Sequence, residues 1–306
     1  MNWPLVSIVT INYDHPEVTI CLLASLRMVT YPNIEIIVVD NASPKDDPSI
    51  LKQSYPEIIF IQSTTNLGFA GGNNLGVRQA KGKYILFINN DTEVDPDFLE
   101  PLVAKFESNS KIGAESPKIK FYDHPDTIQF CGQAPMNIYT MRSHGLGHGQ
   151  VDKGQFEVDT QTYFVHGAAM MVPLSVIYHV GLMPECYFLY YEELDWCANI
   201  KRAGYELWYV HNSSLLHKES ISTGKLSPFK TYYMNRSRLL YLRRNVNGLP
   251  FFIAILYQIL IAIPKNLLVF LLKKDKGHLK AYCRAIGWHL KNLFSKEIHT
   301  NPKLST

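Results

Sequence analysis

Four clusters of polar residues each follow a short apolar run within the first 91 residues. Carboxylate and amide oxygens suit hard divalent cations, and glycines let a backbone approach a phosphate closely. Such clusters predict a ligand-binding site. Any one of them is also explained as a plain loop, because Asn, Asp and Gly are common loop residues. The clusters span residues 12–14, 40–43, 64–74 and 89–91.

A different chemistry is indicated by the sequence Tyr-Glu-Glu-Leu-Asp at residues 191–195. A carboxylate can act as the general base that removes a proton from a hydroxyl. The same stretch begins a helix that we expect over 191–203, ended by Gly204, and acidic residues also favour helix N-termini. Capping explains one carboxylate better than three. We therefore expect the base among Glu192, Glu193 and Asp195.

The elements that must position these residues are strands at 5–11, 34–39, 58–61 and 84–88. Unbroken apolar runs of this length are typical of parallel strands buried on both faces. Helical patterns separate them, including one at 71–80, so the alternation predicts an α/β fold with a doubly wound parallel sheet. Right-handed crossovers would bring the carboxyl ends of the strands, and the polar clusters, to one edge.

The remainder of the chain up to residue 222 is less regular. We expect a helix at 96–107, a strand at 162–172 and a short strand at 206–210. A polar segment that holds His217 follows at 214–222. Residues 121–160 predict either a long loop region or short antiparallel strands.

Composition and cysteine usage narrow the class of protein. The chain has 306 residues, of which 46% are hydrophobic and 19% charged. This suits one large α/β domain, or an ordinary domain with an appendage. Five scattered cysteines without a CxxC pair argue against a disulfide framework and a structural zinc site. The N-terminus has no basic signal-peptide region, so we expect a reducing, cytoplasmic setting.

The C-terminal part differs from the rest in charge and hydropathy. From residue 265 onward nine Lys and Arg face two Asp and Glu, a balance of +7, while residues 1–264 carry 21 basic and 25 acidic residues, a balance of −4. Two apolar runs, 249–263 and 267–272, are separated by Pro264-Lys265-Asn266, and each is shorter than the roughly 20 residues that cross a bilayer. We expect an interfacial or re-entrant element on an anionic membrane surface, since basic residues flank both ends. A buried pair of core helices is the alternative.

Six ordered blocks resemble the family 2 glycosyltransferases, especially their bacterial rhamnosyltransferase-like branch, over about residues 5–245. The resemblance implies a GT-A fold, which is Rossmann-like with a mostly parallel sheet and helices on both faces. We expect a transferase domain over 1–245, with a nucleotide-binding half at 1–91 and an acceptor half at 92–245. A helical, membrane-associating extension would occupy 246–306. The blocks are VSIVTINYD, IIVVDNAS, NLGFAGGNNLGVRQAKGKYILFINNDTEVDP, VHGAAMMVP, FLYYEELDWCANIKRAGYELWYV and HKESIST.

The resemblance assigns roles to thirteen residues. Nucleotide-sugar contacts are implied for Thr10, Asn12, Asp40, Asn66, Gly72, Asn73, Asn89 and Asn90. Asp91 would be the main ligand of a divalent metal, Mn²⁺ or Mg²⁺, and His217 would complete the metal shell or be an ordinary surface histidine. Asn89 stands where the family motif has Asp. Glu193 aligns with the catalytic base in place of the usual Asp, and Glu192 and Asp195 stay candidates.

The implied reaction is an inverting sugar transfer from a nucleoside-diphosphate donor, dTDP-rhamnose or a UDP-hexose. The acceptor would be a hydroxyl of a glycan or lipid-linked acceptor in cell-surface polysaccharide synthesis, on the inner face of the plasma membrane. One alternative is a non-catalytic membrane-associated binding subunit of the same fold. Another is a sugar nucleotidyltransferase, although the Gly-rich loop of that class is replaced by NYDHPEVT. Nucleic acid is not an expected partner.

Overall fold

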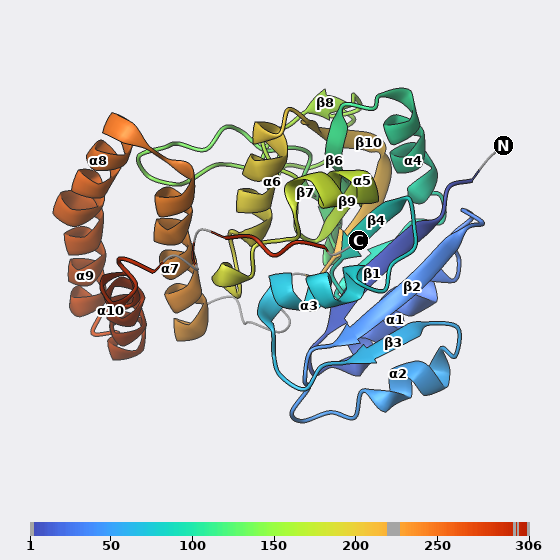
Figure 1. Cartoon of the computed structure of the whole chain (residues 1–306), viewed down its shortest axis with the longest axis horizontal. Coiled ribbons are helices and arrows are strands. Elements are labelled where there is room, and N and C mark those ends of the chain that lie inside the picture. The colour runs from blue at the N-terminus through green and yellow to red at the C-terminus, as the bar shows by residue number, and fades with distance from the viewer. Residues whose placement is uncertain (1–2, 219–226, 296–297, 299, 305–306) are drawn as a thin grey trace.

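The computed structural model describes residues 3–218, 227–295, 298 and 300–304. Its centre is one sheet with the strand order β3-β2-β1-β4-β9-β6-β10-β5, while β7 pairs with β6 and β8 with β10 (Figure 1). The strands β1 to β4 are parallel, β9 is antiparallel to β4, and β6 and β10 are parallel to each other. The strands are β1 (Val6–Asn12), β2 (Ile34–Asp40), β3 (Ile59–Gln62), β4 (Tyr84–Ile88), β5 (Thr92–Val94), β6 (Ile112–Phe121), β7 (His124–Phe130), β8 (Thr160–Gln161), β9 (Ala169–Pro173) and β10 (Glu206–His217).

Helices cover both faces of the sheet, as the α/β prediction requires (Figure 1). Val6 and Ile8 of β1 point into one core and Val9 into the other. Both faces of this strand are therefore buried, as expected for a central parallel strand. The helices are α1 (Pro16–Leu26), α2 (Ser49–Ser54), α3 (Gly68–Val77), α4 (Leu99–Ser108), α5 (Leu174–Val180), η1 (Glu185–Tyr187), α6 (Glu192–Arg202), α7 (Pro228–Asn245), α8 (Gly248–Tyr257), η2 (Gln258–Ala262), α9 (Ile263–Leu272) and α10 (Lys276–Lys291).

The four N-terminal strands and the helix at 191–203 are confirmed, and several boundaries differ from the expected ones. The strand expected at 162–172 is formed only from Ala169 onward as β9. The strand expected at 206–210 continues to His217 as β10, so the first part of the polar segment is a strand paired with β6. The rest of that segment, residues 219–222, lies outside the described residues. Residues 121–160 contain β7 followed by a long loop with isolated bridges.

Pro264-Lys265-Asn266 separates the two apolar runs in the sequence and does not end the helix, which is continuous from Gly248 to Leu272. Proline normally disrupts a helix by lacking an N–H and crowding the preceding turn. Here a π turn over Gln258–Ala262 directly precedes Pro264, which falls in the first turn of α9. A π turn changes the local hydrogen-bond pattern, so the helix accommodates the proline without ending.

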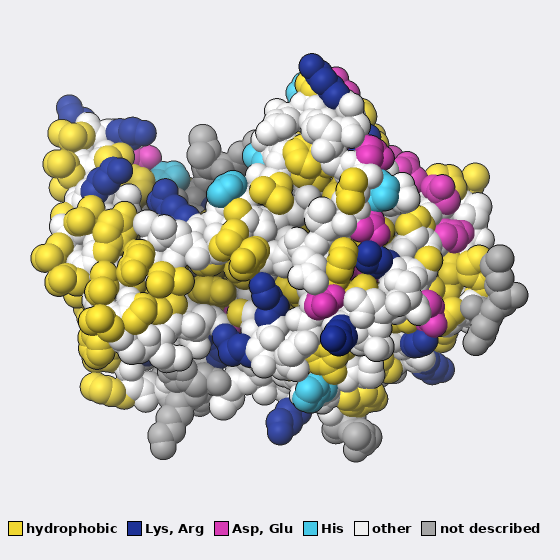
Figure 2. Space-filling view, turned by 90° about the horizontal axis from the view of Figure 1, so that it is seen from above, with side chains coloured by type: hydrophobic (Ala, Val, Ile, Leu, Met, Phe, Trp, Pro, Cys, Tyr) yellow, Lys and Arg dark blue, Asp and Glu magenta, His cyan; other side chains and the backbone are white. Residues whose placement is uncertain are grey.

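This helix does not form a buried core pair, which excludes that alternative. Only 6% of its most apolar 18-residue window is buried. Figure 2 shows hydrophobic side chains gathered over this end of the molecule. By length and composition this single helix could cross a membrane. The exposed large apolar side chains of the helix are Leu249, Phe252, Ile253, Leu256, Ile259, Leu260, Ile261, Leu268, Val269, Leu271 and Leu272.

The packing of α3 on the sheet generates a stability prediction. A Cβ at Gly76 would lie 2.4 Å from Val9 Cγ1, whereas a Cβ at Gly287 in α10 would meet nothing within 4 Å. Gly76→Ala should lower the free energy of unfolding by about 1–3 kcal/mol through overpacking. Gly287→Ala should raise it by about 0.5–1 kcal/mol through helix propensity. Urea unfolding measures both, and equal stabilities would contradict the close contact between α3 and β1.

Candidate active site

Most of the predicted site residues meet in one cavity of about 390 Å³ at the carboxyl ends of β1 and β4. This volume is within the range of cofactor and ligand pockets. The start of α6, the end of β10 and the start of α7 complete its wall. Eight of the thirteen line it: Asn66, Asn73, Asn89, Asn90, Asp91, Glu192, Glu193 and His217. The other five, Thr10, Asn12, Asp40, Gly72 and Asp195, are buried outside this lining.

Asp91 and His217 form one corner of the cavity although they are far apart in sequence. The Oδ1 atom of Asp91 lies 3.1 Å from Nε2 of His217, and both side chains are buried. The other ring nitrogen of His217, Nδ1, lies 2.7 Å from Oε1 of Gln129. Because an amide oxygen only accepts, Nδ1 carries a proton, and in the neutral ring Nε2 is the atom whose lone pair is available to a metal.

This corner fits a divalent cation. Asp91 Oδ1 is buried and has no hydrogen-bond partner, an arrangement that a protein normally avoids. Neighbouring ligands in an octahedral shell with bonds near 2.1 Å are roughly 3 Å apart, which matches the spacing of Asp91 Oδ1 and His217 Nε2. The contact from His217 to Gln129 is the kind of outer interaction that orients a histidine ligand. Asn89 lies beside this pair, with Nδ2 3.5 Å from Nε2 of His217.

Asp40 lies behind the cavity in a closed hydrogen-bond network. Its Oδ1 accepts from Asn12 Nδ2 at 3.0 Å and from the Ser43 hydroxyl at 2.5 Å. Asn12 Oδ1 accepts in turn from Thr19, whose hydroxyl also accepts from Asn90 Nδ2. The network therefore links the ends of β1, β2 and β4. It holds Asn90 in place at the cavity wall.

Helix α3 begins three residues before the predicted start, and this changes the role of its amides. The N–H groups of Leu67 and Gly68 donate to the side chains of Asn41 and Asn66, and that of Phe69 donates to the carbonyl of Phe188. These three amides are therefore already paired within the protein. Gly68, with a φ of 71°, allows the close approach of Phe188.

Glu192 and Glu193 stand side by side at the start of α6, on the cavity wall. Burial raises the pKa of Glu192 well above its usual value, and the charge of Glu193 raises it further. Burial also raises the pKa of Glu193. Tyr190 and Tyr191, which precede the pair, have positive φ angles of 65° and 74°. Strained backbone of this kind is common where a side chain must be held for function.

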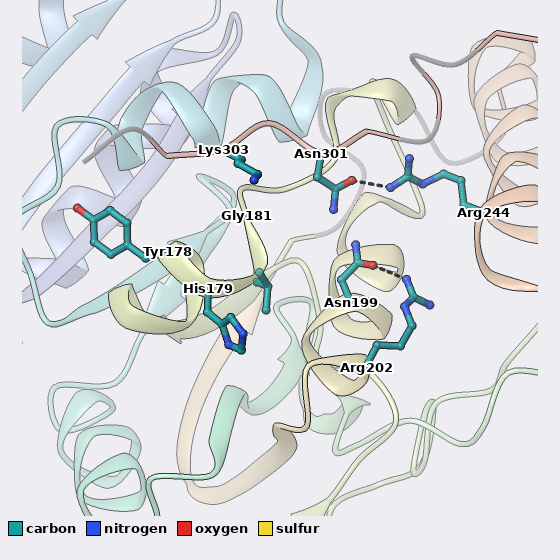
Figure 3. A pocket seen from close by; sticks show the side chains of 9 residues that line it. Tyr178, His179, Gly181, Asn199, Arg202, Arg244, Asn301 and Lys303 are labelled. Atoms are coloured by element: carbon teal, nitrogen blue, oxygen red, sulfur yellow. Dashed lines mark hydrogen bonds between the residues drawn. The ribbon is translucent and has the colours of Figure 1, made fainter.

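Asp195 is turned away from the cavity. Its carboxylate is completely buried, pairs with Arg244 and accepts from Asn245 Nδ2 at 2.7 Å. Arg244 also lines a separate cavity of about 340 Å³, where it donates to Asn301 (Figure 3). None of the thirteen predicted residues lines that second cavity. The geometry gives Asp195 a structural contact with α7 and leaves Glu192 and Glu193 as the carboxylates that face the pocket.

Comparison with known proteins decides the family. The model of "Glycosyl transferase family 2" matches residues 7–178, more than half of the chain. The chain belongs to this family. The match contains the Asn89–Asp91 motif and ends before the acidic pair and His217.

Two curated relatives are matched over most of their length by this glycosyltransferase. The low-salt glycan biosynthesis hexosyltransferase Agl10 of Haloferax volcanii is 25% identical over 76% of this chain and 74% of its own. An N-acetylglucosaminyl-diphospho-decaprenol L-rhamnosyltransferase of Mycobacterium tuberculosis is 22% identical over 66% of this chain and 72% of its own. Four other relatives are matched over only 10% to 54% of their lengths.

Solved structures agree on the GT-A fold. The mannosyltransferase PcManGT from Pyrobaculum calidifontis, in complex with GDP-Man and Mn²⁺, has a TM-score of 0.58 at 16% identity over 97% of this chain and 83% of its own. GalNAc-T7 with UDP, GalNAc and Mn²⁺ has a TM-score of 0.61 at 15% identity over 78% of this chain and 48% of its own. At these identities the likeness shows the fold alone.

The glycosyltransferase cavity also contains residues to which the sequence analysis gave no role. His166 lines it, and its Nδ1 accepts from the N–H of Ala168 at 3.0 Å. Burial, reinforced by His217, lowers the pKa of His166 to about 3, so the ring is neutral and its Nε2–H is a donor. Tyr13 and Phe188 add aromatic surface. The sequence offered only a lone histidine between apolar residues, which is no signal by itself.

Glu193 and Asp195, both on α6, should respond differently to the removal of their charge. Asp195→Asn should lower the free energy of unfolding by about 3–5 kcal/mol, because it leaves the buried Arg244 without its counter-charge. Glu193→Gln should leave stability nearly unchanged and lower the transfer rate about 10²–10⁴-fold. Thermal unfolding and turnover of both variants test this. An Asp195→Asn protein with wild-type stability would show that the ion pair is not structural.

The burial of Glu192 predicts a pH-dependent stability. Its folded-state pKa is raised, so its contribution is complete below the unfolded value near 4.5 and is lost as the pH rises through the folded pKa. Glu192→Gln should therefore match the wild type in acid. Above the unfolded pKa, the stability of the variant relative to the wild type should rise by up to about 1.4 kcal/mol per pH unit, until the folded pKa of Glu192 is passed. Urea unfolding across the pH range measures the difference, and a difference that does not change with pH would refute it.

Proposed function

We propose that the protein is an inverting hexosyltransferase that moves a sugar from a nucleoside-diphosphate donor to a hydroxyl of a glycan or lipid-linked acceptor in cell-surface polysaccharide synthesis. The main observation behind this proposal is that a single cavity contains both kinds of residue that the reaction needs. The Asp91 and His217 pair occupies one part of it, and Glu192 and Glu193 occupy another. A site for a diphosphate with its cation and a site for a base are what sugar transfer requires.

The donor in this proposal is dTDP-rhamnose or a UDP-hexose. Support comes from relatives whose names give hexosyl and L-rhamnosyl transfer, and from a fold neighbour that was solved with UDP. Asn66 and Asn73 line the donor side of the cavity, with Tyr13 as an aromatic surface for the base. Three buried residues that do not line the cavity would position this wall: Asp40, Asn12 and Thr10.

A divalent metal, Mn²⁺ or Mg²⁺, is the proposed cofactor, held by Asp91 and His217. When bound it would neutralise charge on the departing diphosphate. Both fold neighbours contain Mn²⁺. Few protein ligands are typical of a cation shared with substrate phosphates. Asn89 beside the pair supplies an amide where a second carboxylate would add charge.

Glu193 is the proposed general base. Two adjacent buried carboxyls do not both ionise readily, so one proton stays on the pair and one carboxylate is free to accept another. The proton of the acceptor hydroxyl passes to that carboxylate while the acceptor oxygen bonds to the anomeric carbon. The bond from this carbon to the diphosphate oxygen breaks at the same time, which inverts the configuration. The raised pKa of Glu193 makes it a stronger base near neutral pH.

We further propose that residues 1–245 are the transferase domain and that 246–306 attach it to a membrane. The halves 1–91 and 92–245 would bind donor and acceptor. The burial pattern of the helix Gly248–Leu272 supports this attachment. Its polar Gln258 is buried and donates to the carbonyl of Tyr139, while most of its leucines and isoleucines are exposed. Polar side chains turned inward and apolar ones outward are typical of lipid-facing helices. The location would be peripheral, on the inner face of the plasma membrane.

Donor hydrolysis tests the proposed activity. Purified protein should slowly release nucleoside diphosphate from one sugar in a panel of dTDP- and UDP-sugars, with Mn²⁺ or Mg²⁺ but not with EDTA. Asp91→Ala should reduce the release at least about 10²-fold, because it removes the main proposed ligand. If no hydrolysis is found, calorimetry with the same nucleotides shows whether the donor binds at all. Binding without turnover would favour a non-catalytic binding subunit, and absence of both would refute the donor site.

A further inference from the structure

A small basic cavity lies between the helix Gly248–Leu272 and the transferase domain, apart from the donor site. Its volume is about 90 Å³, several times that of one water molecule. Its walls come from α7, from the apolar helix, from α10 and from the loop that precedes residue 143. It is lined by Thr140, Arg142, Asn235, Arg238, Leu239, Tyr257, Gln258, Ala262, Lys265, Asn266, Tyr282 and Ile286.

The charge of this cavity is not balanced within the described part of the chain. Three cations line it, Arg142, Arg238 and Lys265, and none of the residues that line it is Asp or Glu. Among the described residues, no carboxylate forms an ion pair with any of the three. Three like charges around one small space repel each other unless an anion lies between them. Arginine and lysine donors in this arrangement suit a phosphate group.

The surroundings of the cavity indicate where such a phosphate would come from. Tyr257, Ala262 and Lys265 contribute to the cavity from the same helix whose outer face carries exposed Leu256 and Leu260. A ligand with its phosphate in the cavity would therefore contact a helix whose other face is apolar and exposed. Figure 2 shows this apolar surface with Lys and Arg side chains close to it. An amphiphile matches both features, whereas a free nucleotide matches only the charge.

The cavity is also connected to the proposed base. Arg238 Nε donates to the hydroxyl of Tyr191 at 3.1 Å, and Tyr191 immediately precedes Glu192. On α7, Lys230 lines the donor cavity and Arg238 lines the basic one. Eight residues of helix separate these positions by about 12 Å. A headgroup held at Arg238 would thus lie near the acidic pair of the active site.

We propose that this cavity binds the phosphate group of a lipid, and thereby positions a lipid-linked phosphate acceptor for transfer. The inference rests on the membrane contact proposed above, because a lipid phosphate reaches the cavity only if the apolar helix lies in the bilayer surface. It goes further by naming the phosphate as the recognised group. Arg142, Arg238 and Lys265 are its positioning residues.

Vesicle binding with matched variants tests the proposal. The full chain should bind vesicles of phosphatidylcholine, and about tenfold more tightly when they contain phosphatidic acid. Arg142→Gln with Lys265→Gln should lose this gain and keep the binding to neutral vesicles, since both side chains are exposed. Lys273→Gln with Lys274→Gln removes the same charge at the end of the helix and should keep the gain. Equal loss in the two double variants would overturn the cavity in favour of diffuse surface charge.

Two further measurements separate the possible failures. Calorimetry with inorganic pyrophosphate should show weak binding that the Arg142 and Lys265 double variant loses. If pyrophosphate binds but phosphatidic acid adds nothing to vesicle binding, the cavity takes free phosphate and the lipid assignment is overturned. Donor hydrolysis by this double variant should equal that of the wild type. Failure of hydrolysis in the wild type would therefore refute the proposed activity without touching the cavity.

Discussion

The buried ion pair between Asp195 and Arg244 joins the parts of the molecule on which the active site depends. Asp195 lies on the helix that begins with the acidic pair, and Arg244 lies near the end of α7. Burying two opposite charges costs free energy unless further hydrogen bonds satisfy them. Asn245 provides one for Asp195, and the carbonyl of Ile298 accepts another from Arg244. The C-terminal segment is thus part of the support for α6.

Helix α7 also supports the turn that leads into the acidic pair. Arg236 donates to the carbonyls of Cys186 and Tyr187, and the hydroxyl of Ser237 donates to the carbonyl of Leu189. These contacts hold a backbone with positive φ angles that would otherwise relax. The family match ends at residue 178, so this wall belongs to the part of the chain outside that match. The opposite part of the cavity, by contrast, is formed at the ends of the parallel strands β1 and β4.

The same helix that supports the active site connects it to the C-terminal extension. α7 packs against α10, and α10 packs against the apolar helix that ends at Leu272. A continuous set of packed helices therefore joins the apolar surface to Glu192 and Glu193, the proposed catalytic carboxylates. This arrangement would suit an enzyme whose acceptor is held at a membrane surface while its donor arrives from solution.

The four N-terminal strands, and the edge at which their polar clusters gather, were predicted from the sequence, because apolar runs that end in Asn and Asp are local patterns. The roles expected for Asp91 and Glu193 came from the family resemblance, and both residues line the same cavity. The direction of each side chain was not predictable, since Asp195 is on the same helix as Glu193 and differs only by its rotation about the axis. Packing against Arg244 turned it inward. Likewise, the sequence did not reveal the π turn that precedes Pro264 in the continuous apolar helix. Residue type is a local property, whereas burial and direction result from contacts between segments distant in sequence.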